Sequence, residues 1–194
     1  MAKKILSFVT VLLIVAGVSL SGYSIFNIWN SAQQQDKLLV EAKGLIFESP
    51  PQEEEEIDIP EFQIGDTIGI LEVPKIDEEL PIVEGTDSEQ LRKGVGHYIG
   101  TALPNQNDQI VLSGHRDTVF KKFDQIGIGD QFIVKLQYGD FTYEIVDTKI
   151  VDADDLTVIK PTAPEEILTV TTCYPFGYIG DAPERFIFTA KRVN

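Results

Sequence analysis

The sequence predicts an all-β domain that follows one long apolar helix. Short runs of apolar and β-branched residues recur from about residue 62 onward, with turn residues between them. No long amphipathic helix pattern interrupts these runs. The first thirty residues contain an apolar stretch long enough to cross a bilayer. Many short strands at regular spacing are typical of a β-sandwich or a closed β-barrel.

The apolar stretch covers residues 5–28 and carries no charge. A helix of about 20 apolar residues spans a membrane. Lys3 and Lys4 precede it, which predicts a cytoplasmic N-terminus and a domain on the outer side of the membrane. A cleaved signal peptide is the alternative, but the candidate cleavage site near Ser19 is poor and the apolar run is long. We therefore expect a retained single-pass anchor over residues 1–29.

Residues 30–61 differ from both the anchor and the domain. Helical spacing of apolar residues predicts a short amphipathic stalk helix over residues 30–47. Pro50-Pro51 and the acidic run Glu53–Glu56 follow. Because proline and like charge resist compaction, we expect an extended acidic linker there, solvated rather than metal-binding. The folded domain then occupies residues 62–194.

The predicted strands share apolar, β-branched or aromatic residues, and turn-forming residues bound them. They are Thr67–Val73, Leu80–Val83, Gln109–Gly114, Gln131–Leu136, Phe141–Val146, Lys149–Val151, Ile167–Thr172 and Phe186–Ala190. Ser88–Lys93 has room for one or two helical turns. Residues 137–140, Gln-Tyr-Gly-Asp, are typical of a hairpin turn.

Charge and cysteine content limit the partners. The formal net charge is −15, whereas nucleic acid and anionic lipid both require basic surfaces. The single cysteine, Cys173, cannot form an internal disulfide, so it is a free thiol in an exported domain. One cysteine and two histidines, His97 and His115, do not supply the ligands of a structural zinc site. We expect no metal and no cofactor.

Cys173 is the candidate nucleophile. It ends an apolar strand and precedes Tyr-Pro-Phe-Gly, which breaks the strand pattern. A group at such a junction is held on a rigid scaffold, although a small buried apolar residue is the alternative interpretation. His115 lies where another strand ends in a glycine-containing turn. A nearby imidazole raises the thiolate fraction of a cysteine.

Arg185 is the third candidate. If the strand that ends at Cys173 pairs antiparallel with the strand that begins near Arg185, the loop between them returns the chain to the cysteine. A guanidinium beside a tetrahedral oxyanion stabilises it. A surface ion pair with Glu184 or Asp181 is the alternative, and such pairs contribute about 0–1 kcal/mol.

These motifs together resemble the sortase family, the membrane-anchored cysteine transpeptidases of Gram-positive surfaces. Residues 169–173, Thr-Val-Thr-Thr-Cys, match the family's Thr-Leu-x-Thr-Cys except at Val170. The other matching segments extend the resemblance over Ile68 to Lys191. They are Ser113–Thr118 around the histidine, Gly96–Pro104 before it, Phe120–Asp130 after it and Glu184–Phe188 around the arginine.

The resemblance implies a closed eight-stranded barrel and a two-step reaction. Cys173 attacks the threonine carbonyl of an LPxTG-type sorting signal on a surface protein and forms a thioester. An amine of a cell-wall precursor or a pilin then releases the product as a new amide. The resemblance implies that His115 is the general acid/base. It also implies that Arg185 holds the substrate or stabilises the oxyanion. Splitting one difficult step into two explains the need for the thiol.

Three residues are secondary candidates for substrate contact or positioning. Thr172 adjoins the cysteine and is expected to shape the oxyanion site or the threonine pocket. Asp117 lies two residues beyond His115, a spacing that lets it orient the imidazole, although a solvated turn aspartate explains it as well. His97 lies in a segment that resembles the family. We expect its side chain either to reach the groove or to make a structural hydrogen bond.

The sequence leaves alternatives for both the sortase subclass and the type of reaction. The Cys-Tyr-Pro-Phe sequence and the end of the chain after the last strand resemble class D, and no Asp-Pro-aromatic lid motif of class C occurs in residues 48–67. A surface cysteine protease that transfers the acyl group to water is the first alternative. A non-catalytic binding module with a buried cysteine is the second.

Overall fold

The computed structural model describes residues 2–48, 59–177 and 180–193. The chain divides into two units, Met1–Gln34 and Gln35–Asn194, and each is described by itself. The acidic linker predicted around Pro50-Pro51 and Glu53–Glu56 lies outside the described residues.

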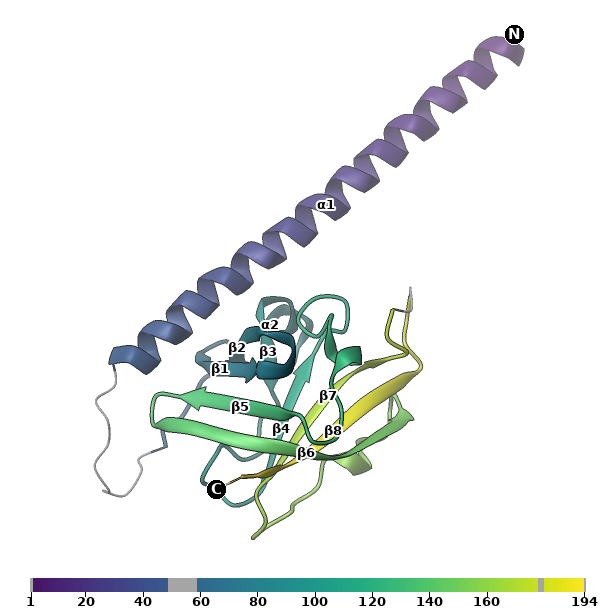
Figure 1. Cartoon of the computed structure of the whole chain (residues 1–194). Coiled ribbons are helices and arrows are strands. Elements are labelled where there is room, and N and C mark those ends of the chain that lie inside the picture. The colour runs from purple at the N-terminus through teal and green to yellow at the C-terminus, as the bar shows by residue number, and fades with distance from the viewer. Residues whose placement is uncertain (1, 49–58, 178–179, 194) are drawn as a thin grey trace. The chain divides into compact units, whose positions relative to one another are not determined.

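Helix α1 extends from Ala2 to Glu48 (Figure 1). The predicted anchor and the predicted stalk helix are therefore one continuous helix. The sequence allows this because no proline occurs before Pro50, and proline is the residue that most strongly ends a helix. Within it, Val9–Phe47 contains a stretch long and apolar enough to cross a membrane, and that stretch is not buried. It is one candidate membrane span.

The second unit contains a closed β-barrel, which confirms the predicted fold class (Figure 1). In the described residues its strand order is β1-β2-β3-β4-β7-β8-β6-β5. The strands are β1 Thr67–Val73, β2 Glu78–Glu84, β3 Val95–His97, β4 Gln109–Gly114, β5 Gln131–Leu136, β6 Gly139–Asp152, β7 Ile167–Tyr174 and β8 Glu184–Arg192. The helical elements are short: α2 Ser88–Lys93, and 3-10 turns η1 Pro74–Ile76, η2 Phe123–Gln125 and η3 Leu156–Val158.

Two strands differ from the prediction. Phe141–Val146 and Lys149–Val151 belong to the single strand β6, which pairs with β5 along its first half and with β8 over most of its length. A register shift lies between Ile145 and Asp147, beside the polar residues Asp147 and Thr148 that separated the two predicted strands. Conversely, β3 has only three residues and a central glycine, so it shows no alternation that a sequence pattern can detect.

The order of the central strands brings three chain segments to one end of the barrel. β4 and β7 are parallel neighbours, with Gly114 opposite Thr172. β7 and β8 are antiparallel, with Cys173 opposite Arg185. The carboxyl ends of β4 and β7 and the start of β8 therefore meet, and His115 follows directly on β4. This confirms the predicted strand pairing on which the placement of Arg185 depended.

Aromatic side chains fill the barrel below this end. Phe120 stacks on Phe123 with 3.8 Å between ring centroids, and Phe188 packs edge-on against Phe123 at 5.9 Å. All three are buried. A Cβ at Gly114 would lie 2.4 Å from the Phe120 ring, so only glycine fits at the end of β4. The packed core thereby fixes the backbone from which His115 projects.

Candidate active site

Alternation along β7 decides which side chains face outward. Leu168 and Val170 belong to the buried core, so the odd-numbered neighbours point to the opposite face. On that face Thr169, Thr171 and Cys173 line a surface groove. Cys173 is partly exposed, whereas a cysteine one position earlier would be buried, as Thr172 is.

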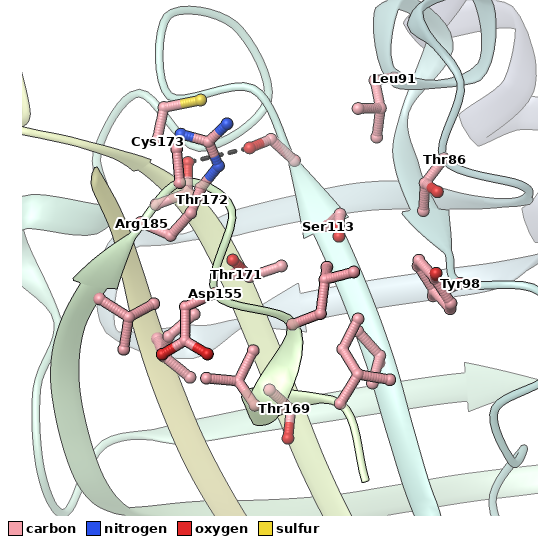
Figure 2. A pocket seen from close by; sticks show the side chains of 18 of the residues that line it. Thr86, Leu91, Tyr98, Ser113, Asp155, Thr169, Thr171, Thr172, Cys173 and Arg185 are labelled. Carbon is pink, nitrogen blue, oxygen red and sulfur yellow. Dashed lines mark hydrogen bonds between the residues drawn. The ribbon is translucent and has the colours of Figure 1, made fainter. Parts of the chain in front are cut away.

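His115, Cys173 and Arg185 line the same end of this groove. Figure 2 shows Cys173 and Arg185 at that end, with Thr86, Leu91 and Tyr98 on the far wall. The three residues come from the ends of three neighbouring strands. The pairing of these strands in the barrel, and not the loop conformation, brings them close together. The structure thus brings together the three residues that the sequence singled out.

The guanidinium of Arg185 is held by its own turn. One nitrogen, Nη1, donates to the carbonyl oxygens of Glu184 at 2.9 Å and Ala182 at 3.2 Å. Among the described residues, the ion pairs include none between Arg185 and Glu184 or Asp181, the alternative considered from the sequence. These backbone contacts use one edge of the planar group and fix its orientation at the groove.

Burial and nearby charge act in opposite directions on His115. The imidazole is half-buried, and burial lowers its pKa below the ordinary 6.5 because the protonated ring loses solvation. The carboxylate of Asp117 raises the pKa, and the positive charge of Arg92 lowers it. The net effect favours a neutral imidazole near pH 7, the form that accepts a proton.

The groove itself is mostly apolar and has a volume of about 290 Å³. Its walls come from β4, β7 and β8, from the segment around η3, and from residues near α2 and β3. The apolar lining residues are Leu91, Tyr98, Val111, Val151, Ala153, Leu156, Val158, Ile159 and Ile187. Asp155 is a charged exception, and it accepts hydrogen bonds from the backbone N–H and the hydroxyl of Thr157. A cleft of this character binds an extended peptide with apolar side chains.

Thr172 is oriented differently from its neighbours. Its side chain is buried, and its hydroxyl donates to the carbonyl of Gly114 at 2.9 Å. The bond fastens the end of β7 to the end of β4, directly before Cys173 and His115. The predicted contact of Thr172 with substrate stays a prediction. In the fold, its hydroxyl joins the ends of β7 and β4 by a hydrogen bond.

His97 is buried beside the groove rather than in its lining. Its Nδ1 lies 2.7 Å from a carboxylate oxygen of Glu84, and its Nε2 lies 3.1 Å from the carbonyl of Ala102 and 3.1 Å from the hydroxyl of Thr101. Both ring nitrogens are occupied by protein partners. This arrangement is the structural hydrogen bonding considered from the sequence, and a substrate contact by His97 stays a prediction.

Arg116 is a residue that the sequence reasoning missed. Its buried guanidinium donates to the carbonyl oxygens of Pro175 at 3.1 Å and Gly180 at 2.7 Å, which both belong to the loop between β7 and β8. Its Nε lies 3.4 Å from the carboxylate of the exposed Asp117. No spacing pattern reveals this role, because the partners are backbone carbonyls and only the fold brings them near.

Comparison with known proteins agrees with this geometry. A family model described as Sortase domain matches residues 71–193. Sortase D of Bacillus subtilis (strain 168) is 46% identical over an alignment of 192 residues that covers 94% of this chain and 96% of that protein. The sortase C structure from Clostridium perfringens SM101 is 28% identical, with a TM-score of 0.62 over 87% of this chain and 90% of that chain. A Clostridium perfringens Sortase D5 transpeptidase shares the fold with a TM-score of 0.68 at 24% identity, over 84% and 99%.

A closed eight-stranded barrel that brings a lone thiol, an imidazole and a guanidinium to the end of an apolar groove has the architecture of a cysteine transpeptidase. The chain belongs to the sortase family. It is accordingly a cysteine transpeptidase, and its N-terminal apolar helix is consistent with membrane anchoring.

Proposed function

We propose that this chain cleaves LPxTG-type sorting signals of surface proteins through a thioester on Cys173. The convergence of Cys173, His115 and Arg185 at one end of an apolar groove is the observation that carries the proposal. Cys173 is also the only cysteine available to a cysteine transpeptidase. The apolar lining suits the leucine and proline of such a signal, which would lie extended along β4 and β7.

In the first step the Cys173 sulfur bonds to the threonine carbonyl carbon. The carbon–nitrogen bond to the following residue breaks, and the leaving amine takes a proton from the imidazolium of His115, which received it from the thiol. In the second step an amine nitrogen bonds to the same carbon and the carbon–sulfur bond breaks. His115 moves the proton from the amine to the departing sulfur. Arg185 stabilises the oxyanion in both steps.

The secondary candidates take supporting roles in this proposal. Thr172 positions the ends of β4 and β7 through its bond to Gly114. Asp117 acts on His115 through its charge. His97 supports the wall that carries Tyr98, through its contacts with Glu84 and Ala102.

The proposed domain division follows the sequence prediction. Residues 1–29 anchor the chain with the N-terminus in the cytoplasm, residues 30–61 form stalk and linker, and residues 62–194 form the catalytic domain outside the membrane. The candidate span in α1 and the lysines at its start support this topology. The acceptor is a cell-wall precursor amine or a pilin amine.

The test uses full-length protein in detergent with LPxTG-type peptides and an oligoglycine or diaminopimelate-type amine, with products read by mass spectrometry. Wild type should give a thioester on Cys173 and a new amide product, and Cys173→Ala should give neither. His115→Ala should lower the rate by about 10²–10⁴-fold. Arg185→Ala should lower it by about 10²–10³-fold. Lys191→Ala, which removes an exposed cation from the same strand β8, is the matched control and should keep the wild-type rate.

Two outcomes would contradict the proposal. Cleavage without amide product at saturating amine would make the enzyme a hydrolase that transfers the acyl group to water. No adduct with any sorting peptide would remove the proposed substrate class.

A further inference from the structure

A buried amide lies near the end of the groove that is remote from Cys173. Gln109 is the first residue of β4, and it is 6% exposed. Its Nε2 donates hydrogen bonds to the carbonyl oxygen of Val158 at 2.8 Å and to the hydroxyl of Thr169 at 2.9 Å. Its Oε1 accepts a hydrogen bond from the backbone N–H of Lys160 at 2.7 Å. Both ends of the amide therefore have protein partners.

These three bonds join the floor of the groove to one of its walls. Thr169 belongs to β7 in the floor, and Val158 belongs to η3 in the wall. Asp108, directly before Gln109, extends the connection, because its carboxylate accepts hydrogen bonds from the backbone N–H and the hydroxyl of Thr162. The segment from η3 onward is thereby tied to the start of β4, which preorganises this end of the groove.

Gln109 also lies between the groove and a second cavity. This cavity has a volume of about 130 Å³, and Thr101, Asp108, Gln109 and Lys160 are among the residues that line it. Ile159 lines both cavities, whereas Val158 and Thr169, the partners of Gln109, line the groove. Truncation of the Gln109 side chain would therefore connect the two spaces.

The position of this amide fits the length of the proposed signal. Figure 2 shows Thr169, Thr171 and Cys173 in order along β7, with Thr169 at the end remote from the thiol. The four-residue step from Thr169 to Cys173 spans about 13 Å of strand. When the threonine carbonyl of an extended LPxTG-type signal lies at Cys173, the leucine is three residues earlier, or about 10 Å away. The leucine side chain then lies close to Thr169, on the same side of the groove as the amide of Gln109.

We propose that Gln109 is a specificity-determining residue whose amide forms the end wall of the groove and limits the size of the first side chain of the signal. The inference rests on the proposed function. A side chain larger than leucine must displace an amide that three hydrogen bonds hold in a packed environment. Displacement separates the buried amide from its partners at Val158 and Lys160, and buried polar groups that lose their partners are costly.

The decisive measurement is a ratio of kcat/KM values for full-length protein in detergent. One peptide is an LPxTG-type signal, and the other has phenylalanine in place of its leucine. Gln109→Ala opens the groove toward the second cavity and should lower the leucine-to-phenylalanine ratio by about tenfold, the lower end of what one change in side-chain size produces in an apolar pocket. Gln109→Asn retains the amide on a side chain one methylene shorter and should lower the ratio less.

Gln109→Met separates the wall from the hydrogen bonds. Methionine fills a similar volume without the three bonds, so the ratio should stay near that of wild type. The KM for the leucine peptide should rise, because the segment around η3 is no longer tied to the floor. Gln109→Asn carries the selectivity test if Gln109→Ala does not fold.

Two controls distinguish altered selectivity from general damage. Gln131→Ala removes the same side chain from the start of β5, outside both cavities, and should leave the ratio unchanged. Iodoacetamide should alkylate Cys173 at the wild-type rate in every variant, because Gln109 lies near the opposite end of the groove.

The outcomes separate the two proposals. If wild type forms no thioester with the leucine peptide, the proposed function fails before selectivity is measured. If the thioester forms but the ratio for Gln109→Ala and Gln109→Asn equals that for Gln131→Ala, Gln109 does not form the end wall. A fall in kcat/KM by the same factor for both peptides would also overturn the inference, since it would make the role of Gln109 structural alone.

Discussion

At the scale of single residues, the ionisation of His115 is balanced between burial and Asp117. Burial lowers its pKa and the Asp117 carboxylate raises it. Since the folded-state pKa lies below 6.5, the unfolded chain takes up a proton first as the pH falls through that value. Protonation of this group therefore opposes folding on the acid side, and its unfavourable contribution disappears above about pH 6.5.

Asp117→Asn should lower the pKa of His115 further, because it removes the charge that raises it. The acidic limb of the pH–rate profile should move to lower pH by the same amount. NMR titration of the imidazole Cε1–H measures the pKa directly in the folded protein. Asp147→Asn is the control of equal charge and should leave the titration in place. An unchanged or raised pKa in Asp117→Asn would mean that its carboxylate does not act on the ring.

The sequence singled out residues that have distinctive side chains in recognisable motifs. It missed roles that depend on which segments the fold brings together. Cys173, His115 and Arg185 are recognisable because their side chains and motifs are particular, and strand order needed only one assumption to bring them together. Thr172 shows its fastening role only once β4 and β7 are known to be parallel neighbours. Arg116 bonds to backbone carbonyls, which every residue has, so no pattern identifies its partners.

At the scale of elements, the end of β4 depends on a close contact with the core. Gly114→Ala would place a methyl group 2.4 Å from the ring of Phe120, which is itself stacked on Phe123. Either the ring or the strand end must move, and overpacking of this kind costs about 1–3 kcal/mol. We expect a lower free energy of unfolding in denaturant titration and a slower reaction, because His115 projects from that strand end.

Gly127→Ala is the matched control for Gly114→Ala. A Cβ at Gly127 meets no atom within 4 Å, and its backbone φ lies outside the left-handed region. The control should keep both stability and rate. Equal behaviour of the two variants would show that the contact with Phe120 does not hold the end of β4.

Element prediction succeeded where one strand face is buried and failed where local pattern is weak. β4 and β5 match their predicted ranges residue for residue, because their apolar runs are bounded by turn residues. β6 was divided in two because its middle turns polar toward solvent, while pairing with β8 keeps it extended. β3 was missed because it is too short to show a sequence pattern. It is a strand because its backbone pairs with β2 and β4. The predicted total of eight strands therefore agreed through two compensating errors.

At the scale of the whole molecule, one thiol and one apolar helix make membrane topology measurable. Lys3 and Lys4 precede the apolar stretch of this helix and predict that the barrel lies outside the cell membrane. Since Cys173 is the only cysteine and is partly exposed at the groove, a membrane-impermeant maleimide should label the full-length protein in intact cells at this position alone. Cys173→Ala should remain unlabelled. Labelling only after lysis would place the barrel in the cytoplasm, and labelled protein that has lost an N-terminal tag would replace the retained anchor by a cleaved signal peptide.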